Sequence, residues 1–268
     1  MIASLVGARV APVEEVTIAL DLAGSATGPS RGTLRSALAN LDTLTTGGEV
    51  YDRGKWRLDA PVRRTSLVFP RDSSPSPVAR FAVPGVFTVP RHLAANWVEG
   101  VARPELVAAF GSVTPELIDK LPEGPAAEHR RASRFVVIVI AVGTDGSHAR
   151  GVVEGSDMYG TTAVIAVEAA RRLVTDSPKP GLLAPAQAYD PTDFLDFLVP
   201  TASAGPLNRR ASYQDRSGLV DDETRDPDAD RCRRQSSAGG AVRSSSSRHR
   251  VGHLLVGLLI VAAARSRI

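Results

Sequence analysis

Apolar and polar residues in the first 50 positions follow a pattern that predicts a strand and then a helix. Residues 14–20 (EEVTIAL) have the alternation of a half-buried strand. From Arg31 to Leu41 the apolar residues recur at helical spacing, and Ser30 before them is a good N-cap. Gly47-Gly48 predicts the end of this helix, because glycine readily adopts the left-handed conformation found at helix ends.

The middle of the chain predicts short strands followed by a helical insertion. Runs of β-branched and aromatic residues bounded by prolines predict strands at 64–69, 79–83 and 96–102. Residues 103–131 hold four prolines, each placed to open a short helix: Pro104, Pro115, Pro122 and Pro125. We therefore expect several short helices between two strands.

Residues 135–154 predict a β-hairpin. The uninterrupted apolar run 135–142 (FVVIVIAV) indicates a strand that is covered on both faces. The turn GTDG at 143–146 then leads into a second strand, 149–154. We expect this hairpin at the centre of the sheet.

Two further helices complete the pattern. In residues 161–174, one stripe contains Ala163, Val167, Ala170 and Val174. We expect this stripe to pack on the hairpin, with Glu168 and Arg172 as an i,i+4 ion pair on the outer face. Asp190-Pro191 predicts the cap and first residue of a short last helix. Without strict βαβ alternation, the fold class is α+β, with a mixed or mostly antiparallel sheet and helices packed on it.

Composition adds a contrast between the first 200 residues and the rest. The chain of 268 residues is 43% hydrophobic and 23% charged, with a net charge of +3, which is ordinary for a globular protein. The segment 201–250 has ten arginines, no lysine and almost no large apolar residue, which predicts a disordered tail without specific nucleic-acid binding. The single cysteine, Cys232, excludes an intramolecular disulfide. No secretory signal is evident, so we expect a cytoplasmic protein.

Several common catalytic and cofactor motifs are absent from the sequence. There is no G-x-G-x-x-G dinucleotide turn and no GxxxxGK[ST] phosphate loop. Among the five histidines, only His249 and His253 have a metal-ligand spacing, and they lie in the tail. We therefore expect neither a metal nor a cofactor bound by this chain alone.

Polar residues at predicted helix starts are the remaining candidate site residues. Ser30 and Arg31 either cap their helix or receive a carboxylate or phosphate of a substrate. Tyr159 is a candidate proton donor, with Asp157 to orient it. The alternative for Asp157 is a plain helix cap.

Several motifs, in order, resemble one family. GPSRGT, the prolines around VPRHL, DMYGTTA and LLAPAQA are similar to the C-terminal part of actinobacterial saccharopine dehydrogenase-like oxidoreductases, the group that includes the trans-acting enoyl reductases. The resemblance covers residues 1–200 and implies a substrate-side and dimerisation domain of an NAD(P)-dependent enzyme. It also places Arg91 and His92 near the substrate cleft. The family's N-terminal Rossmann domain has no counterpart here, so the resemblance implies that it is encoded upstream of Met1.

The sequence after Pro200 departs from this resemblance. The family commonly continues with residues close to His-Gly-Val-Arg-Trp-Thr, and GC-rich codons for these residues, read one nucleotide later, encode Thr-Ala-Ser-Ala-Gly-Pro, the sequence at 201–206. This match favours a frameshift over a functional linker. Residues 251–268 form a separate short apolar end, in which 251–264 offer a membrane anchor as the alternative.

Three functions are compatible with these observations. The first is a fragment of an NAD(P)-dependent oxidoreductase that supplies the substrate-side domain and is inactive alone. The second is a non-enzymatic binding or assembly module that works with a separately encoded Rossmann partner or as a homodimer. The third is a tail-anchored membrane protein.

Overall fold

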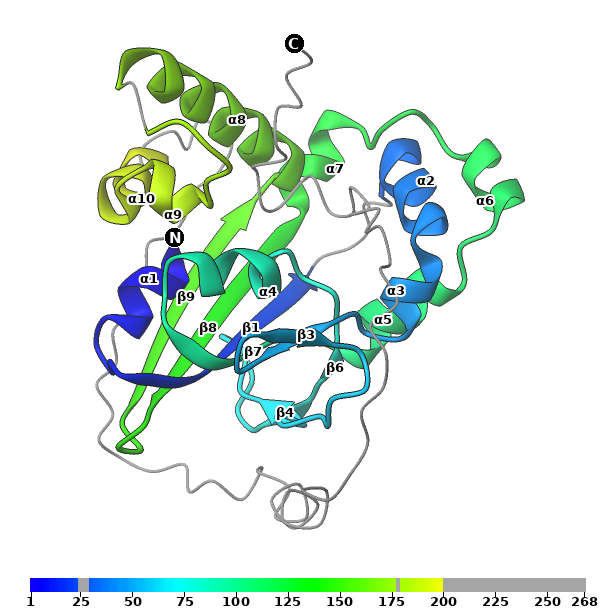
Figure 1. Ribbon diagram of the computed structural model, residues 1–268. Helices are drawn as coiled ribbons and strands as arrows, with labels where there is room; N and C mark the ends of the chain where they lie inside the picture. Colours follow the sequence, from blue (N-terminus) through cyan, green and yellow to red (C-terminus); the bar gives the residue numbers. More distant parts are fainter. Residues whose placement is uncertain (24–28, 177–178, 200–268) are drawn as a thin grey trace.

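A mixed sheet forms the centre of the molecule in the computed structural model, which describes residues 1–23, 29–176 and 179–199 (Figure 1). Its strands lie in the order β3-β2-β7-β1-β8-β9, with β6 paired to β7 beside this path. The strand bounds are Val13–Ala23 (β1), Val50–Asp52 (β2), Lys55–Arg57 (β3), Ala79–Arg80 (β6), Ala95–Ala102 (β7), Arg134–Gly143 (β8) and His148–Ser156 (β9). A separate small sheet pairs β4 (Ser66–Leu67) with β5 (Ser76–Pro77).

Pairing in the main sheet confirms the predicted α+β class with mostly antiparallel strands. Among the described pairs, only β1–β7 is parallel. The antiparallel pairs are β1–β8, β8–β9, β2–β3, β2–β7 and β6–β7. The apolar run at 135–142 lies in β8, between β1 and β9, as expected for a strand covered on both faces. β9 lies at one end of the sheet, so the prediction of a central hairpin is wrong for its second strand.

Helices cover the sheet and its ends (Figure 1). They are α1 (Ile2–Gly7), α2 (Arg31–Ala39), α3 (Leu41–Thr45), α4 (Gly85–Thr88), α5 (Pro104–Gly111), α6 (Pro115–Lys120), α7 (Ala127–Ala132), α8 (Met158–Thr175), α9 (Pro185–Ala188) and α10 (Pro191–Leu198). A short 3-10 helix, Val89–Arg91, follows α4. The predicted helix after Ser30 is confirmed but divides at Asn40 into α2 and α3, and Gly47 and Gly48 then adopt positive φ angles of 80° and 70°.

The insertion and the short strands differ from prediction in detail. Pro104 and Pro115 open α5 and α6 as expected, but Pro122 and Pro125 precede the start of α7. The strands predicted at 64–69 and 79–83 are only two residues long, as β4 and β6.

The first face of the sheet carries most of the apolar core. Val16, Ile18 and Leu20 of β1 point to this face and are at most 5% exposed. They pack with Val6 of α1 and Val86 of α4 in the same cluster. The strand predicted from this alternation is therefore confirmed, and its apolar positions lie on the buried side of β1.

The second face of the sheet is partly charged. Glu15 and Glu99 come from the paired strands β1 and β7 and are 8% and 1% exposed. Arg63 and Arg64, in the segment before β4, approach Glu15 at 3.3 and 3.7 Å, and the Arg63 guanidinium lies 3.8 Å from the ring centre of Trp97. These five residues form the buried charged cluster of the fold.

Helix α8 is longer than the predicted 161–174, and its two faces are reversed with respect to the prediction. Val167 and Val174 are 71% and 83% exposed, whereas Glu168 and Arg172 are 4% and 7% exposed. Arg172 donates from Nε to Glu168 Oε1 at 2.7 Å and also pairs with Asp193 of α10. The inward side of α8 also contains Ala169, Val164 and Ile165, which cluster with Phe194 and Leu198 of α10, while the predicted stripe faces outward.

The end of the described chain is α10, whose cap confirms the sequence prediction. Asp190 Oδ1 accepts the backbone N–H of Asp193 at 2.7 Å, and Pro191 is the first helical residue. The predictions for 201–250 and 251–268 lie outside the described residues. In the part of the chain that is described, no helix has the length and apolar character needed to cross a bilayer.

Candidate functional site

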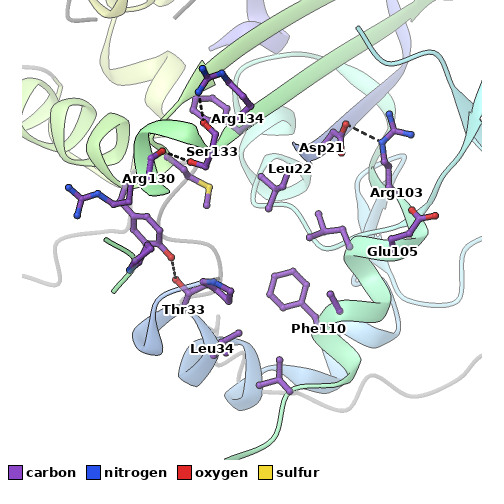
Figure 2. A pocket seen from close by; sticks show the side chains of 18 of the residues that line it. Asp21, Leu22, Thr33, Leu34, Arg103, Glu105, Phe110, Arg130, Ser133 and Arg134 are labelled. Atoms are coloured by element: carbon purple, nitrogen blue, oxygen red, sulfur yellow. Dashed lines mark hydrogen bonds and ion pairs between the residues drawn. The ribbon is translucent and has the colours of Figure 1, made fainter. Parts of the chain in front are cut away.

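A cavity of about 520 Å3 lies between the end of the sheet and the inserted helices. Helices α2, α5, α6 and α7 form its outer walls, while β1, β8 and the first turn of α8 close the other side (Figure 2). Most of the side chains that line it are apolar: Leu22, Pro29, Leu34, Leu106, Ala109, Phe110, Val113, Leu117, Leu121, Pro125, Phe135 and Met158. Such a lining suits a ligand with an apolar body.

Polar groups lie at two opposite edges of this cavity (Figure 2). On one edge, Arg103 donates from Nε to Asp21 Oδ2 at 3.0 Å, and its second arm reaches Asp72 at 2.9 Å. On the other edge lie Tyr159, Arg130 and Ser133, with Arg134 beside them. The charge of Arg103 is therefore matched by two carboxylates. At the second edge Arg130 pairs with Asp157 at 3.5 Å, whereas the described hydrogen bonds of Arg134 go to the backbone carbonyls of Arg131 and Ser133, so the positive charge there is that of Arg134.

Tyr159 lines the cavity and holds the start of α2. Its hydroxyl oxygen accepts the backbone N–H of Ser30 at 2.7 Å and lies 3.1 Å from the Thr33 hydroxyl (Figure 2). Either hydroxyl can be the donor in the contact between Tyr159 and Thr33. The predicted proton donor is therefore at the cavity, but its hydroxyl is engaged in a network that joins α8 to α2.

Ser30 and Arg31 are brought to the same place as Tyr159. Ser30 Oγ accepts the Thr33 N–H at 3.1 Å, which is the predicted N-cap. The Arg31 side chain donates from Nε to the Leu121 carbonyl at 3.1 Å, and its backbone N–H donates to the Glu123 carbonyl at 3.3 Å. Arg31 thus fastens α2 to the loop after α6 and fixes one wall of the cavity.

Asp157 lies directly before Tyr159 and caps α8. It adopts a left-handed conformation with φ of 45°, and its Oδ1 accepts the Gly160 N–H at 2.9 Å. The Arg130 guanidinium approaches the same oxygen at 3.5 Å. A methyl group at Gly160 would come within 2.6 Å of Asp157 Oδ2, so glycine is needed for this cap. The carboxylate orients the helix start that carries Tyr159.

We expect Asp157→Ala to lower the free energy of unfolding by about 1 to 2 kcal/mol, because the N-cap hydrogen bond is lost and alanine is strained at positive φ. Asp157→Asn should cost only a few tenths of a kcal/mol, because asparagine accepts the same bond and tolerates the left-handed conformation. Urea unfolding of both variants checks this. Equal losses in the two variants would contradict the capping role.

Arg91 and His92 do not line this cavity. Arg91 lies in the 3-10 helix and donates to the Leu182 carbonyl at 2.6 Å, while its own carbonyl accepts from Gln187 at 2.7 Å. Burial lowers the pKa of His92 to about 4, and the positive N-terminal amine acts in the same direction. His92 is therefore neutral at pH 7. The six candidate residues thus separate into four near the cavity and two at the end of the 3-10 helix.

Three of the N–H groups at the start of α2 are already used within the fold, which disfavours a dinucleotide phosphate there. A pyrophosphate site needs free N–H groups at a helix N-terminus that follows a parallel strand. In α2 the N–H groups of Ser30, Arg31 and Thr33 already donate to Tyr159, the Glu123 carbonyl and Ser30 Oγ. The described residues also contain no group of three or more His, Cys, Asp or Glu side chains placed to bind a metal.

Comparisons with known proteins leave the family open. No protein-family model matches the chain, and no curated protein matches it. The saccharopine dehydrogenase-like resemblance therefore rests on the sequence motifs, and the function is argued from the cavity.

The sequence pattern did not indicate the cavity itself. Its walls come from helices of six to nine residues, α2, α5, α6 and α7, whose inner sides become apolar walls only after they assemble. Arg103 and Arg130 also gain their roles through partners far away in sequence, Asp21 and Asp157. The one available signal was the dense series of prolines in 103–131, which indicated several short helices but not what they surround.

Proposed function

We propose that this chain is the substrate-side domain of an NAD(P)-dependent oxidoreductase, inactive alone, which binds a mainly apolar substrate in the cavity beside Tyr159. The observation that carries the proposal is the 520 Å3 cavity, with an apolar lining and the positively charged side chain of Arg134 at one edge. Its size is within the usual range for small-molecule sites, about 300 to 1,000 Å3. A substrate with an apolar body and an anionic or carbonyl oxygen fits a cavity that has an apolar lining and a positive charge at one edge.

The redox cofactor is supplied by a separate nucleotide-binding unit in this proposal. The occupied N–H groups at the start of α2 support this assignment, because they leave no phosphate cradle there. When bound by that unit, NAD(P)H supplies the hydride, and the residues of this chain hold and orient the substrate. Tyr159 is positioned to donate a hydrogen bond to a substrate oxygen if the ligand displaces Thr33 from it.

A non-enzymatic binding or assembly module is the second candidate, and the exposed apolar side of α8 favours it. Monomeric proteins rarely present a long apolar helix face to solvent. In that case the cavity serves for ligand binding only. The two candidates differ in whether any nucleotide-binding unit restores redox activity.

Ligand titration of the full chain tests the proposal. We expect the apolar anion 1-anilinonaphthalene-8-sulfonate to bind in the cavity and to gain fluorescence, whereas NADH and NADPH should show no tight binding by calorimetry. Tight binding of either nucleotide would contradict the assignment of the cofactor to another unit.

A substitution that fills the cavity tests whether the probe binds there. We expect Ala109→Trp to weaken binding of the probe at least about tenfold, or about 1.4 kcal/mol, because the indole fills the cavity. Ala108→Trp is the control, since Ala108 is the exposed neighbour on α5 and does not line the cavity. Thermal unfolding of both variants separates a blocked site from a misfolded protein. Equal affinity in the two variants would show that the probe binds elsewhere.

A further inference from the structure

The outer face of α8 is an apolar surface whose spacing matches a helix-pairing seam. Its exposed apolar residues are Ala163, Ala166, Val167, Ala170, Leu173 and Val174. The steps from Ala163 to Val167, to Ala170 and to Val174 are four, three and four residues, the spacing of the a and d positions of a coiled coil. We call these six residues the α8 seam.

The charged residues of α8 are already used inside the domain. Glu168 accepts hydrogen bonds from Arg171 and Arg172, at 2.7 Å in each case, and Arg172 also reaches Asp193 of α10. These hydrogen bonds lower the pKa of Glu168 to about 2. An ordinary surface helix has one apolar stripe, which faces inward. Helix α8 has that stripe in Val164, Ile165 and Ala169, which pack in the cluster with α10, so the outer seam is a second apolar stripe. The sequence therefore keeps the seam apolar although it faces solvent.

We propose that the α8 seam pairs with the same seam of a second copy of this chain, in antiparallel orientation across a two-fold axis. In this orientation Ala163 lies opposite Val174 of the other copy, and Val167 lies opposite Ala170. Every layer then combines one valine with one alanine, so the layers have equal volume. A parallel pair would alternate crowded Val–Val layers with loose Ala–Ala layers, which pack less evenly.

The ends of the helix favour the same orientation. Asp176 is the C-cap of α8. In the antiparallel pair it lies beside the first turn of the other copy's α8, where the helix dipole favours an acidic side chain. Arg171 lies opposite Ala166 and not opposite its own counterpart, so no like charges meet. An isologous contact of this kind closes as a dimer and cannot extend into a filament.

The size of the seam sets the expected strength of association. The seam runs over about 16 Å of helix, at 1.5 Å per residue. It has fewer than the roughly 20 to 30 residues per side of a standard interface. We therefore expect a reversible dimer that dissociates in the micromolar range.

Sedimentation velocity of the full chain over a concentration series tests the pairing. We expect a monomer–dimer equilibrium for the wild type and at least tenfold weaker association for Val167→Glu, because the carboxylate would be buried in the seam. Val62→Glu is the control, since Val62 is 40% exposed and lies outside α8. A wild type that stays monomeric to its solubility limit overturns the proposal, as does a dimer that Val167→Glu leaves intact.

Disulfide trapping tests the orientation in a Cys232→Ser background. Single variants Ala163→Cys and Val174→Cys are oxidised separately and as a mixture. We expect a cross-linked product only in the mixture, because each position faces the other type in the antiparallel pair. Cross-linking of Val174→Cys with itself would indicate parallel pairing and overturn the proposal.

Discussion

Replacement of Glu99 by glutamine is expected to stabilise the protein by about 3 kcal/mol at pH 8 and to leave its stability unchanged near pH 4. Burial raises the pKa of Glu99 from 4.5 to about 7, and the neighbouring Glu15 carboxylate raises it further in the same direction. The folded protein therefore binds a proton that the unfolded chain releases at lower pH. The wild type is most favoured below pH 4.5 and loses this contribution as the pH rises to about 7.

The contacts in the buried charged cluster explain why ionisation of Glu99, and not of Glu15, destabilises the fold. Both guanidinium groups, of Arg63 and Arg64, approach Glu15. Glu99 Oε1 is buried and has no hydrogen-bond partner among the described residues. Trp97, the charge of Arg64 and the Arg63 backbone favour the ionised carboxylate, but burial and Glu15 outweigh them. Ionisation is therefore only partly compensated, whereas a neutral glutamine has the same shape without the charge.

Urea unfolding at a series of pH values from 4 to 8 measures this difference. The quantity to follow is the difference in the free energy of unfolding between Glu99→Gln and the wild type, because other titrating groups cancel in it. Glu128→Gln, at an exposed position of α7, is the control and should give a constant difference near zero. A Glu99→Gln difference that does not change with pH would show that Glu99 is ionised throughout.

The second large effect is expected at Gly100, where alanine should cost about 3 kcal/mol. A methyl group there would lie 2.3 Å from the Phe81 carbonyl oxygen and 2.5 Å from Val83 Cγ2. Both contacts are too short, and one involves backbone. The chain around β6 must then move away from β7, which weakens the hydrogen bond from the Phe81 N–H to the Gly100 carbonyl, 2.9 Å long.

Thermal and urea unfolding of Gly100→Ala measure this loss. Gly124→Ala is the matched control, because a methyl group at Gly124 meets no atom within 4 Å. That variant should be neutral or slightly stabilising, since alanine reduces the freedom of the unfolded chain. A Gly100→Ala protein as stable as the control would mean that β6 is not held against β7 as described.

Local signals in the sequence predicted those parts of the fold that depend on neighbouring residues. The cap at Ser30, the cap at Asp190 and the apolar run of β8 are all found where expected. Each is determined within a few residues, by a side chain that satisfies a nearby N–H or by a continuous buried strand. The α+β class followed from the order of these elements.

The orientation of α8 shows what local signals could not provide. Helical periodicity separates Val167 and Val174 from Glu168 and Arg172, but it does not state which side faces the domain. That choice depends on Asp193, which lies 21 residues after Arg172 and becomes its neighbour only when α10 packs on α8. The candidate site also depends on a contact between residues far apart in the sequence, because Tyr159 and Ser30 are separated by 129 positions.

Three of the helices that wall the cavity, α5, α6 and α7, lie between two strands that are not neighbours. β7 and β8 are separated in the sheet by β1, so α5, α6 and α7 form a bridge across its end. Residues can be added to or removed from the loops of this bridge without a change in strand register. Ligand size can therefore diverge in evolution, or be redesigned, through this segment while the sheet stays the same.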